Sequence, residues 1–446
     1  MRFDLVIAGD LVLPDGVKEN GWVAVTGGKI AAIGEGDMPD AGEHVTADGL
    51  VFPGIVDGQT HAGSIAGFPG LEDLTRSAAA GGVTTIVDMP FDSPDPVTTG
   101  ALLAEKAATA DKVAYCDVAI YGGVKPDVDT DEIARQTDAG ACAFKMSTYH
   151  ASARFPRIPH HQMERAFAAI AETGLTVAVH NEDQEIVDDA IARFQEAGQK
   201  GANQHHPSRP PLSELLANSI ILEIGVATGA RAHIVHSSLA RGFDMARSYR
   251  DQGCHATAET CLHYLIFDED DVIEMGARGK VNPPIRPDQK ELIWQHILDG
   301  EVAFVSSDHC SWPLERKPDD DIFQAAPGAP GIECLFPVMA DEAIIRRGHD
   351  VGVVADMLCE APARHFGLYP QKGAIRVGSD ADFAILRRER HTVDETKLHC
   401  ELAPWTIYHG RELDFRVGDV WLRGTKVFDG ETMTAPAGTG RFVRPS

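Results

Sequence analysis

The amino-acid sequence predicts an α/β fold, a TIM-like (β/α)8 barrel joined to a small β-sandwich domain that both chain ends form. Three observations predict this fold. Apolar runs typical of buried parallel strands alternate with helical stretches between residues 51 and 368. These runs number eight, as a closed barrel of this type requires. Short strand-like runs separated by Gly-rich turns lie before and after this region.

The predicted strands are separated by helical periodicity over most of the region. We expect strands at residues 51–61, 84–90, 112–121, 141–147, 175–183, 231–238, 255–265 and 302–308. We expect intervening helices at, for example, 71–80, 101–110, 131–139, 162–172 and 211–229. In such a barrel the active site lies at the carboxyl ends of the strands. Polar residues at those ends are therefore the candidate functional residues.

The two ends of the chain, residues 1–50 and 371–446, are each too short for a comfortable core of their own. Both consist of strand-like runs and turns. We expect them to combine into one small β-domain, the second part including a C-terminal tail. The barrel of residues 51–370 would then be inserted between the two parts.

The composition is that of a globular protein, with 43% hydrophobic residues among 446. The formal net charge of −27 argues against nucleic acids and anionic membranes as partners. No run of about 18 apolar residues is present, and the first residues lack the apolar core of a signal peptide. Eight scattered cysteines without a Cys-x-x-Cys pair favour reduced thiols. We therefore expect a cytoplasmic protein that binds neither nucleic acid nor membranes.

The stretch VFPGIVDGQTH at residues 51–61 organises the candidate site. Its β-branched residues predict a buried strand, although a Pro-Gly pair makes its start irregular. Asp57, Gln59 and His61 follow at alternate positions, so their side chains share one face of the strand. A strand end in a barrel presents such a face to the pocket.

Four later apolar runs also end in residues suited to a metal centre. The runs ACAFKMS, LTVAVHNED, RAHIVHSS and VAFVSSDH end at or near Lys145, His180, His236 and Asp308. Histidine and carboxylate side chains are typical zinc ligands. An unpaired lysine at the end of a buried strand is costly, but its neutral form can react with carbon dioxide to give a carbamate with two anionic oxygens. The set predicts one or two divalent ions, zinc first and manganese or cobalt as alternatives, with a carboxylated Lys145.

These motifs resemble those of the cyclic amidohydrolases, which include dihydropyrimidinase, hydantoinase, allantoinase and dihydroorotase. The resemblance covers nearly the whole chain. It is greatest to allantoinase, through GFPGLEDLTRSAAAGGVTTIVDMP (67–90), AETCLHYLIFDEDDV (258–272), NPPIRP (282–287) and VGDVWLRGTKVFDG (417–430). The strand-one motif of the family is His-x-His, whereas this chain has Gln59-Thr60-His61. The resemblance implies metal ligation by His61, carboxylated Lys145, His180, His236 and Asp308, together with Gln59.

The resemblance also implies how these ligands divide between two ions. His61, Gln59 and Asp308 would bind one ion, His180 and His236 the other, and Lys145 would bridge them. The neutral amide oxygen of a glutamine is a weaker zinc donor than imidazole. We therefore expect a weakened first position, so that one of two ions is loosely held or a single ion occupies the second position. The alternative is that Gln59 does not ligate and instead hydrogen-bonds the substrate or the metal-bound water.

Such a centre would hydrolyse a ring amide through a metal-activated hydroxide that attacks the ring carbonyl. Asp308 would take the proton of the attacking hydroxide and pass it to the leaving ring nitrogen. Tyr149 follows Lys145 closely, where hydantoinases and dihydropyrimidinases place a tyrosine that stabilises the oxyanion, although here it comes one residue sooner. A packed aromatic side chain is the alternative interpretation.

Two loops supply candidate substrate contacts. The resemblance implies that the backbone of the NPPIRP loop, at Asn282, hydrogen-bonds a ring imide, while an ordinary proline-stiffened loop is the alternative. Gly331 lies in GAPGIE, either a second substrate loop or a connection into the next helix. Dihydroorotase-like enzymes hold the substrate carboxylate with an arginine soon after His-x-His, but here His61 is followed by Ala-Gly-Ser.

The sequence thus predicts a metal-dependent hydrolase of small cyclic amides or ureides, most like allantoinase. The alternative among enzymes is a hydantoinase or dihydropyrimidinase. The alternative from another class is a non-catalytic, dihydropyrimidinase-like oligomeric protein with a degraded metal site, which Gln59 alone favours. The resemblance also implies a homo-oligomer, either a tetramer or a dimer.

Overall fold

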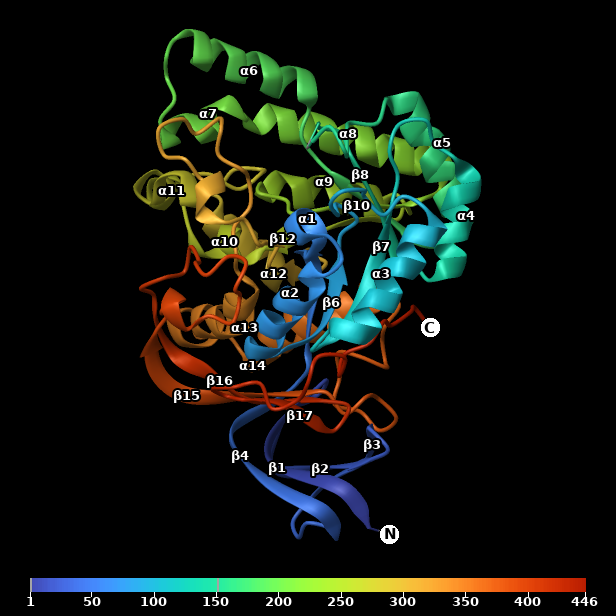
Figure 1. Ribbon diagram of the computed structural model, residues 1–446, viewed down its shortest axis with the longest axis vertical. Coiled ribbons are helices and arrows are strands. Elements are labelled where there is room, and N and C mark those ends of the chain that lie inside the picture. The colour runs from blue at the N-terminus through green and yellow to red at the C-terminus, as the bar shows by residue number, and fades with distance from the viewer. Residues whose placement is uncertain (1, 151) are drawn as a thin grey trace.

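The computed structural model describes residues 2–150 and 152–446. It contains two bodies, a barrel surrounded by helices and a curved sheet beneath it, to which both ends of the chain contribute strands (Figure 1).

The barrel wall is a ring of parallel strands. Its main sheet has the order β11-β10-β9-β8-β7-β6-β5-β14, with parallel pairing throughout. A parallel ladder between β12 and β13 joins the two edges, because β12 follows β11 and β13 precedes β14 in the chain. This closure confirms the predicted (β/α)8 barrel. The strands are β5 (Ile55–His61), β6 (Val83–Asp88), β7 (Asp117–Gly123), β8 (Ala143–Ser147), β9 (Thr176–His180), β10 (Arg231–Ile234), β11 (Ala256–Ala258), β12 (Thr260–Cys261), β13 (Val305–Ser306) and β14 (His309–Cys310).

The first predicted strand is divided between the two bodies, so its expected start at residue 51 is wrong. Residues 51–53 belong to the lower sheet, as the end of β4 (Ala41–Pro53). Gly54 separates them from β5, and its N–H donates to the carbonyl of Asp382 at 2.9 Å. A Cβ at Gly54 would lie 2.0 Å from Thr84 Oγ1, so this crossing between the two sheets has no room for a side chain.

Other expected strands are also too long, and in two of them some of the excess residues are helical. Residues 112–113 of the expected strand 112–121 continue the helix α3 (Gly100–Val113), and β7 begins only at Asp117. The expected strand 255–265 ends at Cys261, because α10 (Leu262–Ile266) follows directly. All residues of α10 are buried, and burial on every side removes the periodic pattern that distinguishes a helix from a strand.

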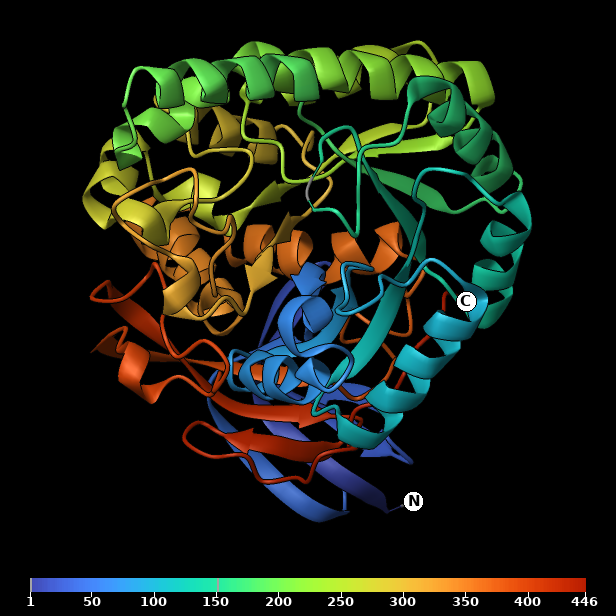
Figure 2. The same ribbon diagram turned by 45° about the horizontal axis from the view of Figure 1, so that its top comes forward.

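Helices cover the outside of the ring (Figure 2). The five helices expected from the sequence are present, each with bounds within three residues of the prediction. The principal helices are α2 (Gly70–Ala80), α3, α4 (Thr130–Ala139), α5 (His160–Ala171), α6 (Gln184–Glu196), α8 (Pro211–Thr228), α9 (Ala240–Asp251), α12 (Lys290–Leu298) and α13 (Ile332–Ala340). Shorter helices are α1 (Gly63–Ala66), α7 (His205–Ser208), α10, α11 (Glu269–Met275), α14 (Val351–Ala355) and α15 (Ala361–His365).

The lower body is a seven-stranded sheet that joins the two ends of the chain. Its order is β17-β16-β15-β4-β1-β2-β3, and the antiparallel pairing of β15 with β4 connects the C-terminal strands to the N-terminal ones. The expected β-domain of both chain ends is therefore confirmed. The exact domain boundaries stay predictions, because one hydrophobic core continues from the barrel into this sheet. The strands are β1 (Phe3–Leu13), β2 (Gly16–Thr26), β3 (Lys29–Glu35), β4, β15 (Phe383–Thr392), β16 (Glu412–Leu422) and β17 (Thr425–Asp429).

One helical stretch, Ala202–Thr228, is long and apolar enough by composition to cross a membrane, with a mean hydropathy of 1.2. In the structure its α8 part lies on the outside of the barrel, against α5, α9 and β10. Its exposed face remains apolar, since Leu212, Leu216 and Val226 are 62%, 40% and 46% exposed.

A buried ionic cluster fixes the lower sheet against the barrel. The Lys372 ammonium lies within 3.0 Å of carboxylate oxygens of Asp117, Asp380 and Asp382. Asp117 opens the barrel strand β7 and also pairs with Arg423 from the sheet. Burial alone would lower the pKa of Lys372, but the three carboxylates hold it above the ordinary lysine value.

Replacing Lys372 with methionine should leave three buried carboxylates without their shared cation. We expect the apparent free energy of unfolding to fall by about 3–5 kcal/mol, measured by urea denaturation and circular dichroism. The control is Lys397→Met, which removes an ammonium on a side chain that is 80% exposed and should leave the transition unchanged. Equal transitions for the two variants would show that the cluster does not hold the bodies together.

Candidate active site

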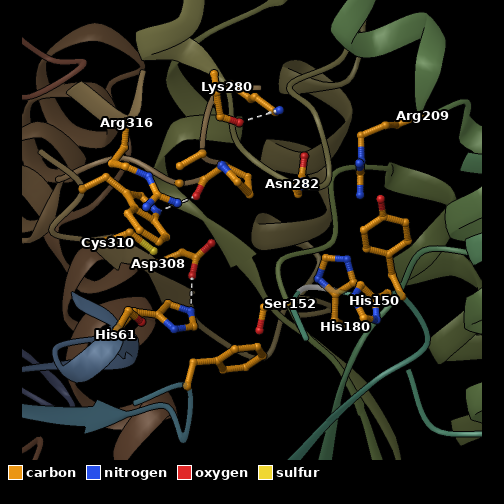
Figure 3. Close-up of a pocket in the computed structure, with 18 of the residues that line it drawn as sticks. His61, His150, Ser152, His180, Arg209, Lys280, Asn282, Asp308, Cys310 and Arg316 are labelled. Carbon is orange, nitrogen blue, oxygen red and sulfur yellow. Dashed lines mark hydrogen bonds and ion pairs between the residues drawn. The ribbon is translucent and has the colours of Figure 1, made fainter. Parts of the chain in front are cut away.

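The predicted ligands come together at the carboxyl ends of the barrel strands, where they line one cavity of about 500 Å³ (Figure 3). Strand ends supply most of them directly, and short loops after strands supply the others. Gln59 and His61 lie on β5, Lys145 on β8, His180 at the end of β9, His236 just after β10, and Asp308 between β13 and β14.

Two of these residues have strained backbones. His236 and Asp308 have positive φ angles of 40° and 47°. Residues other than glycine rarely adopt this conformation, and it persists only where the surroundings fix it. This backbone conformation turns both side chains into the cavity, which a regular extended strand would not do.

Asp308 is contacted by Gln59 and His61, two of the polar residues of β5. Gln59 Nε2 donates to Asp308 Oδ1 at 2.8 Å, and His61 Nε2 lies 3.1 Å from the same oxygen. Burial alone would raise the pKa of Asp308, but the hydrogen bond and charge of His61 hold it below the ordinary value. Asp308 is therefore an ionised acceptor at neutral pH.

The Gln59 amide is only half satisfied. With Nε2 turned to Asp308, its Oε1 atom is buried and has no hydrogen-bond partner among the residues that the structure describes. A buried carbonyl oxygen without a donor is costly, and it is relieved by a metal ion, a water molecule or a ligand. The structure thus leaves a free oxygen where the family has a histidine nitrogen.

On the other side of the cavity two imidazoles converge. His180 Nδ1 lies 3.0 Å from His236 Nε2. Burial lowers the pKa of both rings, that of His236 far below the ordinary value. Both rings are therefore neutral at pH 7, which is the form that binds metals. Figure 3 shows His180 across the cavity from the His61–Asp308 pair.

Lys145 interacts electrostatically with both groups, since its charge acts on Asp308, His180 and His236. Its side chain is almost completely buried, with 1% of the residue exposed. Burial lowers its pKa to about 8, despite the nearby Asp308 and Glu259. Its Nζ makes no ion pair or hydrogen bond with any residue in the described part of the chain. With a pKa of about 8, its neutral fraction at pH 7 is far larger than that of an ordinary lysine, although the charged form still dominates.

Two further residues support His180 from behind. Glu182 Oε2 lies 2.8 Å from His180 Nε2, and the guanidinium of Arg209 contacts both Glu182 oxygens at 2.7 and 2.8 Å. Burial alone would raise the pKa of Glu182, but Arg209 keeps it below the usual carboxyl range. A carboxylate on the outer nitrogen fixes the tautomer and orientation of a ligating histidine.

Sequence reasoning missed this pair. Glu182 follows His180 at an alternate position in HNED, which is the same signal that singled out Gln59 and His61. Nothing local to the sequence connects Glu182 with Arg209, since they are 27 positions apart and come into contact only in the folded protein.

Of the three remaining predicted residues, two line the cavity and one does not. Tyr149 lines the cavity and its ring lies 4.4 Å below the Arg209 guanidinium. Asn282 also lines the cavity, and its Oδ1 is buried without a partner in the described chain. Gly331 does not line the cavity, because its N–H donates to His309 Nδ1 at 3.1 Å at the start of α13. The part of its loop that faces the cavity is residues 323–328.

Known proteins resemble this chain over its full length. The amidohydrolase family model matches residues 50–427. An allantoinase of Rubrobacter xylanophilus is 35% identical over 99% of this chain and 98% of its own, and an allantoinase of Solibacter usitatus is 32% identical over 99% and 97%. Among solved structures, an L-hydantoinase (dihydropyrimidinase) from Arthrobacter aurescens has a TM-score of 0.94 at 29% identity, covering 99% of this chain and 100% of its own. The chain belongs to the amidohydrolase family, as a cyclic amidohydrolase related to the allantoinases and hydantoinases.

Proposed function

We propose that this protein is a metal-dependent hydrolase that opens a cyclic amide ring, with an allantoin-like ureide as the first candidate substrate. One observation carries the proposal: Asp308 with His61, the His180–His236 pair and the buried Lys145 all face one cavity. The relatives named allantoinase support the choice of substrate, since they match 99% of this chain.

The donors in the cavity fit a divalent ion such as zinc, or manganese or cobalt. His61, Asp308 and the free Gln59 oxygen would hold one ion, and His180 and His236 the other. Neutral imidazoles and an ionised carboxylate are the forms that such ions bind. Lys145, as a carbamate, would bridge the two positions, which would also remove its unpaired buried charge. When bound, the ion supplies a Lewis acid that lowers the pKa of water and polarises a carbonyl.

The chain's own groups would move the proton. Water adds to the ring carbonyl carbon, the carbon–nitrogen bond breaks, and one proton must pass from the water to the leaving nitrogen. Asp308, which is ionised and buried, is the group that accepts this proton from the water and passes it to the leaving nitrogen. Tyr149 would donate to the developing oxyanion, and Asn282 would hold the ring through its loop. The role of Gly331 would be indirect, through His309 and the start of α13.

A hydantoinase or dihydropyrimidinase is the second candidate function. It is favoured by the similarity of the whole fold to the Arthrobacter aurescens enzyme, with a TM-score of 0.94 at 29% identity. The two candidates share the cavity chemistry and differ in the ring that is opened.

The apolar outer face of α8 supports a homo-oligomer, a dimer or a tetramer. Leu212, Leu216 and Val226 are 62%, 40% and 46% exposed there, and a second copy would remove them from water. Seven of the eight cysteines are buried and all are unpaired, which suits the reducing cytoplasm that we infer as the location.

The activity itself can be tested on zinc-loaded protein with allantoin, hydantoin, dihydrouracil and succinimide. We expect ring opening of allantoin in the wild type. Lys145→Ala should lose at least about 100-fold in kcat/KM together with bound metal, and added short carboxylic acids should restore part of both. Turnover of dihydropyrimidines alone would favour the second candidate. Absence of both metal and turnover would favour a non-catalytic relative.

The Gln59 position can be tested by titrating zinc into metal-free wild type and Gln59→His. Because an amide oxygen binds zinc less well than imidazole, we expect one tight and one weak equivalent in the wild type. Two tight equivalents should appear in Gln59→His. Calorimetry measures both directly, and activity is followed at each equivalent. Two tight equivalents in the wild type, with no gain in the variant, would refute the weakened position.

Arg209 can be tested as a positioning residue. Arg209→Met removes the partner of the buried Glu182 carboxylate, so His180 loses its fixed orientation. We expect zinc affinity to fall about 10–100-fold, measured by competition with a chelator, and kcat to fall with it. The control is Arg193→Met, since the Arg193 side chain is 71% exposed on α6. An unchanged zinc affinity would show that the Glu182–Arg209 pair serves folding alone.

A further inference from the structure

The lining of the cavity carries an excess of positive charge. Arg154, Arg209, Lys280 and Arg316 all line it, whereas Asp308 is the only carboxylate among the described lining residues. This is unexpected in a chain with a formal net charge of −27. Figure 3 shows Arg316, Lys280 and Arg209 around one half of the cavity and His61 in the other half.

Lys280 is the innermost of these cations that lacks a counter-ion. It is 6% exposed, and its Nζ donates to the carbonyls of Ile322 and Ala325 at 2.6 Å each. Two carbonyls use two of the three ammonium protons and supply no negative charge. The acidic residue whose charge acts on it, Asp321, is itself paired with Lys200 at 3.1 Å.

A second buried lysine, Lys317, adds to the positive charge beside Lys280. Lys317 is 5% exposed, and its Nζ donates to the Lys280 carbonyl at 3.0 Å. Burial lowers the pKa of each ammonium to about 7, Arg209 contributing at Lys280 and Lys280 contributing at Lys317. Neither lysine forms an ion pair with a carboxylate in the described chain. At a pKa of about 7 each lysine is only partly protonated at neutral pH, and an anionic ligand beside them would favour the charged form of both.

The mouth of the cavity continues this charge. Arg316 lies over the Trp312 ring at 5.2 Å, and neither Arg316 nor Arg154 forms an ion pair with any residue that the structure describes. Arg209 differs from them, because Glu182 neutralises it. Among the described lining residues, the charge that no carboxylate neutralises therefore includes Lys280, Arg154 and Arg316. Lys280 and Arg316 lie on the connections after β12 and β14, and not at the end of β5 where an arginine is missing.

We propose that the substrate carries an anionic arm, a carboxylate on a ring substituent, which binds between Lys280 and Arg316 while the ring lies against Asp308 and the two histidines opposite. The proposal rests on the proposed function, and it makes a cyclic ureide or imide with an acidic side chain a better substrate than a ring with a neutral arm, such as allantoin. A bare five-membered ring would fill only a small part of a cavity of about 500 Å³, so there is room for the arm.

The test is a matched pair of substrates, hydantoin-5-acetate and the neutral hydantoin-5-acetamide, which have nearly the same shape. On zinc-loaded wild type at low salt we expect kcat/KM to be at least about tenfold higher for the acetate. Added salt should reduce this preference, because screening weakens the interaction at the mouth. Equal rates, or a faster acetamide, would overturn the proposal.

Two variants locate the arm. Lys280→Gln and Arg316→Gln should each reduce the acetate-to-acetamide ratio, while the control Arg193→Gln on α6 should leave the ratio unchanged. Arg316 is exposed, so Arg316→Gln remains informative if Lys280→Gln does not fold. A ratio that stays at the wild-type value in Arg316→Gln, or in a folded Lys280→Gln, would overturn the assignment of the arm to these residues.

A binding measurement separates this proposal from the proposed function. Calorimetry gives the affinities of both hydantoins whether or not either ring is opened. Failure to hydrolyse any ring, with tighter binding of the acetate, would refute the hydrolase and support the anionic arm. Hydrolysis of the rings with equal affinities and equal rates would support the hydrolase and refute the arm.

Discussion

Lys145 imposes the constraint on which the active site depends. It is a cation on a central barrel strand, with 1% of the residue exposed and no carboxylate partner in the described chain, and burial lowers its pKa to about 8. An isolated charge in such a position is stable only if it is neutralised or modified. The proposed carbamate does both, because it replaces the buried cation with an anion that the surrounding imidazoles and any bound ions can stabilise. This single modification would remove the energetic cost of burying an unpaired ammonium in the cavity.

The two halves of the site are built differently. His180 is fixed by Glu182, which Arg209 holds in turn, so its orientation depends on a chain of charged contacts. On the other half, Asp308 is held by a histidine and an amide, and the amide oxygen remains unpaired. The first half is therefore held in place before any ion binds, whereas the second keeps an acceptor oxygen that no described residue satisfies. The asymmetry follows from the sequence, because residue 59 is a glutamine.

Much of the fold and of the site could be predicted from the sequence, because both depend on local patterns. The apolar runs predict where the strands end, at or near His61, Lys145, His180, His236 and Asp308. The barrel fold then predicts that these side chains converge. The first strand began too early because an apolar run does not show that Gly54 divides two sheets. Glu182 with Arg209, and the unpaired charge of Lys280, could not be predicted, since they result from contacts between distant loops. The sequence leaves open whether Gly331 contacts the substrate, because a Gly/Pro-rich loop does not reveal which of its N–H groups is already bound.

The pairing of β4 with β15, and of β5 with β14, has a consequence for the order in which the protein is made. Each pair joins a strand from the first 61 residues to one that begins at residue 309 or later. β4 can pair early with β1, and β5 with β6, but the other edge of each strand has no partner while the ribosome synthesises the intervening helices. Such open edges can pair with other chains, and long-range closure is slow. Neither sheet can be completed until most of the polypeptide has emerged, so the nascent chain must keep one edge of each strand protected for much of translation.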